Sequence, residues 1–343
     1  MSATTAPASS HRSGARQGPS TVRKVSAILA ILVGVVLIVI TFTNNLFKVG
    51  PAFESLMNDF RPMIQQSAID EAKANLSGLS SVATEVQGKM IPAVSAQLGM
   101  TPDQFSAMVN QQFPAVSAGL QAIPQAVPAF TDLMNTLETN RPLFESADAI
   151  PTKNMPATTV PWMLLISGLL SIGVGILIWF TARAGAIVAL VLGAALVVLP
   201  LIMSLPQKAA DADQLNANLK PVYTQQLIDQ SKQTLTTLGA MGQEMQTKML
   251  PALATQLKMT PDQLNAFLGQ NFPATAAALG GFSTTMSKFQ NMVTAFENNL
   301  DNYKTLEPVK FVPIVWTMIG AGVVLVLLGG AALFAGRGEA KTV

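Results

Sequence analysis

The second half of this sequence repeats the first at a fixed spacing. Between 60–140 and 219–299, about a third of the aligned pairs are identical without any gap. The motif Met-Thr-Pro-Asp-Gln at 100–104, for example, returns 159 residues later at 259–263. A repeat of this length indicates a chain built from two copies of one architectural unit. Other pairs at the same spacing are Lys89 and Lys248, Pro92 and Pro251, Phe113 and Phe272, and Pro114 and Pro273.

Each copy carries two long apolar runs. Apolar residues make up 50% of the chain, charged residues only 12%, and the mean hydropathy is +0.40, which is high for a water-soluble domain. A membrane core about 30 Å thick needs about 20 apolar residues at 1.5 Å per residue. Four runs meet this requirement without Asp, Glu, Lys, Arg or His: 25–42, 160–180, 184–203 and 312–334. They predict four membrane-spanning helices, and we interpret the first as a retained anchor because its counterpart, 184–203, is internal.

Basic residues predict the orientation of these helices. Arg23 and Lys24 precede the first run, Arg183 lies in the short link between the second and third, and Arg337 and Lys341 follow the fourth. The positive-inside rule places these segments in the cytoplasm and the two long connections outside. The predicted divisions are a disordered cytoplasmic tail (1–23), a span (24–43), an extracytoplasmic helical domain (44–159), a span (160–181), a cytoplasmic loop (182–183), a span (184–203), a second extracytoplasmic helical domain (204–311), a span (312–335) and a cytoplasmic tail (336–343).

Both extracytoplasmic domains are predicted to be helical bundles. Apolar residues follow alternating steps of three and four through 69–93, which is typical of a helix packed against another helix. Thr101 and Thr260, each followed by Pro-Asp-Gln, predict capped helix starts. The fold class is therefore an all-α integral membrane protein with four transmembrane helices and two extracytoplasmic helical bundles, arranged as two tandem span–domain–span repeats.

Prolines and small residues give two further expectations. Pro92 and Pro251 should kink or end a long helix, and Pro114, Pro124 and Pro128 should break the distal part of the first bundle into short pieces. Small residues at every fourth position predict tight packing between the second and third spans. These residues are Ser167, Ser171 and Gly175 in the second span, and Gly185, Ala189 and Gly193 in the third.

The residue types argue against an enzyme. The chain has no cysteine, and its one histidine, His11, lies in the polar N-terminal tail. Thiolate and imidazole chemistry therefore have no basis, and we predict no catalytic residue, no metal and no cofactor. Glu85 and Glu244 are interpreted as helix-face partners of the lysines four residues later. A Cu(I) site is the functional interpretation of Met241, Met245 and Met249, and adaptable core packing is the favoured one.

These observations predict a non-enzymatic scaffold or accessory protein of a bacterial inner (plasma) membrane, which binds an envelope partner through its paired external bundles. The alternative is a carrier or transport component for lipids or other hydrophobic molecules, and a sensor is a third hypothesis. Expected partners are membrane lipids and an envelope or membrane protein. A homo-oligomer is compatible with the sequence, whereas the net charge of +2 gives no basis for nucleic-acid binding.

Identity between the copies is concentrated in one segment of each, which we take as the candidate partner contact. Its residues are Met100, Thr101, Phe113, Met259, Thr260 and Phe272. A demanding turn that needs fixed residue types would explain the same identity equally well.

Overall fold

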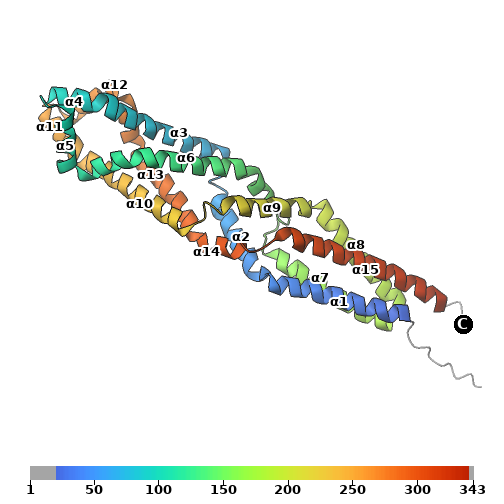
Figure 1. Cartoon of the computed structure of the whole chain (residues 1–343). Helices are drawn as coiled ribbons and strands as arrows, with labels where there is room; N and C mark the ends of the chain where they lie inside the picture. Colours follow the sequence, from blue (N-terminus) through green and yellow to red (C-terminus); the bar gives the residue numbers. More distant parts are fainter. Residues whose placement is uncertain (1–20, 340–343) are drawn as a thin grey trace, which may run out of the picture. The chain divides into compact units, whose positions relative to one another are not determined.

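The computed structural model describes residues 21–339, and every regular element within this range is helical (Figure 1). The first half contains α1 (Thr21–Thr43), α2 (Leu46–Phe60), α3 (Gln66–Glu85), the π-turn η1 (Val86–Met90), α4 (Ile91–Gln97), α5 (Pro102–Gln112), α6 (Pro114–Asp148) and α7 (Thr159–Phe180). The second contains α8 (Ala182–Ile202), α9 (Leu205–Leu219), α10 (Gln225–Glu244), the π-turn η2 (Met245–Met249), α11 (Leu250–Gln256), α12 (Pro261–Asn271), α13 (Pro273–Asn298), α14 (Leu300–Leu306) and α15 (Phe311–Glu339).

Four of these helices are long and apolar enough to cross a membrane: Thr21–Thr43, Thr159–Phe180, Ala182–Ile202 and Phe311–Phe334. The prediction of an all-helical chain with four such segments is confirmed. The predicted tails lie mostly outside the described residues, at 1–20 and 340–343. Residues 21–23 belong to α1 and residues 336–339 belong to α15. The first helix therefore begins before its apolar run, and the last helix ends after its own run, because polar residues at the ends continue the helix.

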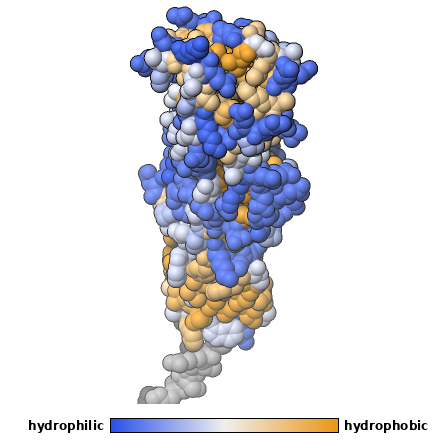
Figure 2. All heavy atoms as spheres, turned by 90° about the vertical axis from the view of Figure 1, so that its left-hand side faces the viewer, coloured by the Kyte–Doolittle hydropathy of each residue, from blue (hydrophilic) through white to orange (hydrophobic). Residues whose placement is uncertain are grey.

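The chain forms two compact units. Unit 1 comprises the described residues up to Thr43, together with Trp162–Ile202 and the chain from Trp316 onwards. Unit 2 comprises Asn44–Pro161 and Met203–Val315. In Figure 2, hydrophobic residues dominate the visible surface of unit 1, while hydrophilic residues cover most of that of unit 2.

In unit 1, glycines bring pairs of helices into backbone contact. A Cβ on Gly34 of α1 would lie under 3.0 Å from the carbonyl oxygen of Gly168 in α7. A Cβ on Gly193 of α8 would likewise lie under 3.0 Å from the carbonyl oxygen of Gly322 in α15. The predicted packing of the second span on the third is therefore only partly right. Gly185 does contact Ile178 near the α7–α8 turn, but Gly175 serves the α1–α7 pair and Gly193 the α8–α15 pair, where the missing side chains permit close approach.

Unit 2 is a single helical assembly built from both halves of the chain, so the two predicted bundles are packed together. Helices from both halves lie side by side along it, α3 against α13 and α6 against α10 (Figure 1). At the centre, Phe130 of α6 meets Phe289 of α13, with ring centroids 5.2 Å apart. These two phenylalanines occupy the same position in the two sequence copies. Each copy thus completes the hydrophobic core of the other, because the apolar stripe of one helix pair needs a second pair to cover it.

Helix boundaries in unit 2 recur at the spacing of the sequence repeat. The helices α3, α4, α5 and α6 begin at 66, 91, 102 and 114, and α10, α11, α12 and α13 begin at 225, 250, 261 and 273. Unusual backbone conformations recur too. Gly99 and Lys258 have φ of 68° and 56°, and Asn45 and Ser204 have φ of 53° and 55°. The same local sequence signals therefore produce the same turns in both copies.

Prolines interrupt the helices less than the sequence predicted. At Pro92 and Pro251 the chain continues through the π-turns η1 and η2, whose wider spacing accommodates a ring that cannot donate a hydrogen bond. A new helix does begin at Pro114, as predicted, but α6 then runs unbroken for 35 residues through Pro124, Pro128 and Pro142, so the predicted breaks at Pro124 and Pro128 are wrong. All three of these prolines are exposed, so water can reach the backbone around them.

Candidate functional site

The predicted contact residues fall into two groups. Thr101 and Thr260 are exposed and cap α5 and α12, each completing a capping box with the glutamine three residues on. Met100 is 36% exposed, and Met259 is half-buried. These four residues lie near the surface at one end of unit 2, and their role as a partner contact stays a prediction.

Phe113 and Phe272 lie in the core instead. They are only 6% and 3% exposed, and they occupy the sharp junctions between α5 and α6 and between α12 and α13. The backbone N–H of each closes the preceding helix, and its carbonyl accepts the first bond of the next. The position of these side chains fits the alternative interpretation, a demanding turn.

We expect Phe113→Ala to destabilise unit 2 by about 3–5 kcal/mol, since truncating a buried phenylalanine leaves a cavity. Phe272→Ala should cost a similar amount. Chemical denaturation of the full chain in detergent, followed by circular dichroism, measures both. An unfolding midpoint equal to that of the wild type would show that the turns tolerate loss of the ring and would return both residues to the list of contact candidates.

A pair of buried glutamates joins the two sequence copies. Glu85 at the end of α3 accepts hydrogen bonds from the backbone N–H of Thr275 (2.7 Å) and from its hydroxyl (2.9 Å), in the first turn of α13. Its counterpart Glu244 at the end of α10 accepts from the backbone N–H groups of Ala115 (2.7 Å) and Val116 (3.0 Å), in the first turn of α6. Each carboxylate therefore caps a long helix of the other copy, where it also meets the positive end of the helix dipole.

The sequence interpretation of these glutamates was incomplete. Glu244 does form an ion pair with Lys248 at 3.1 Å, as expected from the four-residue spacing. Its main surroundings, however, belong to α6. Burial by itself would raise the pKa of Glu244, but the N–H groups of Val116 and Ala115 and the ammonium of Lys248 together hold this pKa below its ordinary value. The sequence does contain a signal for this contact. Both copies keep the glutamate, and both keep the Phe-Pro-Ala motif that begins the helix it caps.

A second reciprocal pair lies further along unit 2. The buried Asn299 donates to Asp59 of α2 at 2.6 Å, and the buried Asn140 accepts from Asn218 of α9 at 2.6 Å. Asn140 and Asn299 occupy the same position in the two copies, as do Asp59 and Asn218. Buried amides without partners are costly, so these contacts favour one register between the copies.

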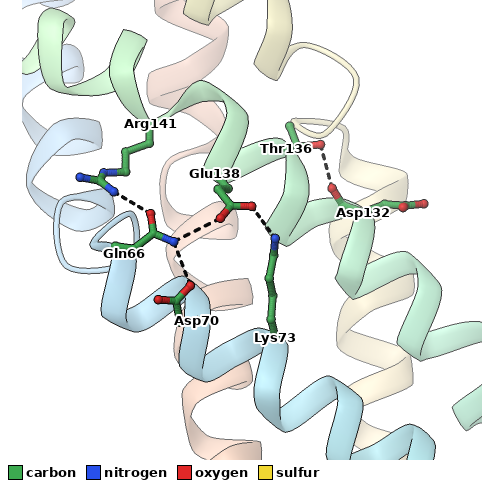
Figure 3. A network of polar contacts seen from close by, with 7 residues as sticks. All are labelled: Gln66, Asp70, Lys73, Asp132, Thr136, Glu138 and Arg141. Carbon is green, nitrogen blue, oxygen red and sulfur yellow. Dashed lines mark hydrogen bonds and ion pairs between the residues drawn. The ribbon is translucent and has the colours of Figure 1, made fainter.

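Within each copy, an exposed ion pair connects the outgoing helix to the returning one. Lys73 of α3 binds Glu138 of α6, and Lys232 of α10 binds Glu297 of α13 at 2.7 Å. Figure 3 shows the larger network of the first copy, in which Gln66 donates to Glu138 and accepts from Arg141. Lys73, followed by Gln66, lowers the pKa of Glu138. The arrangement is a helix–helix contact that solvent can reach.

An apolar groove of about 380 Å³ opens between α3 and α13. Its floor is made of Leu76, Leu235 and Leu238 with the central Phe130 and Phe289. Its walls are mostly small residues: Ala74, Gly78 and Ser81 on α3, and Ala274, Ala277, Ala278 and Gly281 on α13. No Asp, Glu, Lys or Arg is among the residues that line it. This volume lies at the low end of the 300–1,000 Å³ typical of small-molecule sites.

The corresponding contact between α6 and α10 is filled. There Met241 of α10 packs directly onto Gly119 of α6, and Ile123 is fully buried beside it. The equivalent residues at the groove are Val82, Ala278 and Phe282. Met241 thus lies in the packed core of this contact, which fits the favoured interpretation of that residue.

The groove and the paired carboxylate caps both lie where the two sequence copies meet. Comparison with known proteins adds no name to them: no protein-family model matches the chain, and a search of curated proteins finds no match.

Proposed function

We propose that the chain is a bacterial inner-membrane protein made of two tandem span–domain–span repeats, with both termini in the cytoplasm and unit 2 in the extracytoplasmic space. The charge distribution within unit 1 supports this orientation. Arg23 at the start of α1 donates to the carbonyls of Ile178 (2.8 Å) and Trp179 (2.7 Å) at the end of α7, a few residues before Arg183 at the start of α8. Basic residues of two segments therefore meet at one end of unit 1, as the positive-inside rule requires of a cytoplasmic face.

We further propose that the protein is a non-enzymatic scaffold or accessory subunit, which presents unit 2 to an envelope partner. The observation that carries the proposal is the reciprocal capping by Glu85 and Glu244. It fixes the two copies as one stiff body, and four crossings of the chain connect that body to the membrane helices. A rigid body of this kind suits a protein that holds a partner at a fixed position better than it suits a catalytic domain that must move.

The partner contact is proposed at Met100, which is 36% exposed, and at the half-buried Met259, beside the capped starts of α5 and α12. Apolar surface gathers near this end of unit 2 in Figure 2, and such patches on soluble surfaces mark interaction sites. Membrane lipids surround unit 1 in the proposal, and no cofactor is required.

Photo-crosslinking in the host tests this contact. A photoreactive residue is placed at Met100 or Met259, and a matched one at Met155, an apolar residue of unit 2 that is 38% exposed in the segment preceding α7. We expect the same protein adduct from both of the first two positions and none from Met155. Adducts that are absent, or equal at all three positions, would contradict the scaffold proposal.

The groove between α3 and α13 favours a second candidate function, the carrying of a lipid or another hydrophobic molecule. An apolar groove between the assembled repeats is what that function needs.

A further inference from the structure

We propose that the groove between α3 and α13 is a binding site for one hydrocarbon chain of a membrane lipid. The proposal rests on the second candidate function and names its site and its ligand class.

The groove is long enough and narrow enough to hold a single chain. Its lining along α13 extends from Ala274 to Phe289, which is ~22 Å of helix at 1.5 Å per residue. A lipid tail spans roughly half of a hydrocarbon core ~30 Å thick, or ~15 Å. The volume of about 380 Å³ spread over that length leaves a slot ~5 Å wide, and methylene groups in contact with their neighbours at ~4 Å fill such a slot one chain at a time.

The same dimensions argue against other occupants. An α-helix with its side chains is about 10–12 Å across, so a partner helix does not fit between α3 and α13 as they stand. A polar metabolite would find Asn75, Ser81 and Thr285 but no charged group with which to orient it. A hydrocarbon chain needs no polar or charged partner, because its transfer from water is favourable in proportion to the apolar surface that becomes buried.

Polar contacts close the groove at both ends. Beyond Ser81, Glu85 caps Thr275 at the start of α13. Before Ala74, Glu71 forms an ion pair with Lys288 of α13. The apolar section of the groove is thus bounded at each end by a polar contact that joins α3 to α13.

The sequence difference between the copies points to a retained opening. At the α6–α10 contact, Met241 lies over Gly119 and fills the space, whereas at the α3–α13 contact the equivalent Val82 is shorter and Gly281 replaces Ala122. Half-buried Leu79 and Phe282 border the groove there, while Ile123, the counterpart of Phe282, is buried. One of two related interfaces has thus kept apolar side chains available to a ligand.

Two neighbouring glycines provide a test with a matched control. A Cβ at Gly281 or at Gly280 meets no atom within 4 Å, so both positions accept a side chain. Only Gly281 lines the groove. Gly281→Phe should therefore occupy the slot, while Gly280→Phe adds the same ring to the same helix outside it.

The full chain is reconstituted in nanodiscs of phosphatidylglycerol that contain a small fraction of lipid with a diazirine on one acyl chain. After illumination, labelled peptides are mapped by mass spectrometry. We expect labelling of α3 and α13 in addition to the membrane helices, at least a fivefold loss of the α3 and α13 labels in Gly281→Phe, and no change in Gly280→Phe. Diazirine-bearing palmitate in a parallel experiment distinguishes a free fatty acid from a membrane lipid as the source of the chain.

Labels confined to the membrane helices, or equal labels on α13 in both variants, would overturn the proposal. If Gly281→Phe unfolds, Ala277→Leu in the groove and Ala118→Leu at the equivalent exposed position of α6 replace the pair. Transfer of fluorescent lipid between vesicles measures the carrier function separately. A labelled groove without transfer refutes the carrier and leaves the site, whereas transfer without a labelled groove refutes the site.

Discussion

Replacing both buried glutamates by alanine should prevent stable assembly of the two sequence copies. Glu85→Ala leaves the backbone N–H and the hydroxyl of Thr275 without their acceptor in a buried helix start, which costs about 2–3 kcal/mol. Glu244→Ala does the same to Ala115 and Val116. Because the two caps hold the same pair of copies through separate contacts, the losses of the single variants should add in the double variant.

The dependence on pH gives this prediction a second readout. The pKa of Glu244 is held below its ordinary value in the folded protein, so its stabilising contribution is present above the unfolded-state pKa and disappears as the pH falls through the folded-state pKa. The gap in unfolding midpoint between wild type and Glu244→Ala should therefore narrow in acid. Glu145→Ala is the control, since Glu145 is exposed on α6 and pairs only locally with Arg141. If the single and double variants have the same unfolding midpoint as the Glu145→Ala control, the role assigned to the caps is refuted.

Local signals in the sequence predicted local structure well. Thr101 and Thr260 specify capped helix starts through residues three positions away, and the structure contains both capping boxes. The four apolar helices follow from length and hydropathy alone. In each case the residues that determine the element lie within it, so one window of sequence holds all the information.

Partners far apart in the chain could not be predicted in the same way. Glu85 has a lysine four residues away and a helix start 190 residues away, and only the fold shows that the second supplies its hydrogen bonds. The prediction that prolines would break α6 was wrong for a related reason. Whether a proline breaks a helix depends on whether the backbone around it is solvated or packed. The groove arises from small differences, such as Val82 in place of Met241, whose effect depends on which helices become neighbours.

Gly34→Leu and Gly193→Leu should each destabilise unit 1 by about 3 kcal/mol, near the upper end for overpacking. A Cβ at Gly34 would approach the backbone of Gly168 and Ile172, and one at Gly193 would approach the backbone of Gly322 and Val326. Backbone cannot rotate aside as a side chain does, so the helices must move apart and lose the dispersion contacts along the whole α1–α7 or α8–α15 pair.

The control for this last prediction is a glycine of α7 that faces open space. A Cβ at Gly173 meets no atom within 4 Å, so Gly173→Leu adds the same side chain without overlap. Leucine also has the higher helix propensity, which works against any loss of stability from the substitution itself. Titration of the detergent-solubilised protein with sodium dodecyl sulfate should therefore unfold Gly34→Leu and Gly193→Leu at lower detergent fractions than Gly173→Leu and the wild type. Equal midpoints for all four proteins would mean that the spans are held by contacts other than these glycine crossings, and that lipid or unit 2 supplies the missing stability.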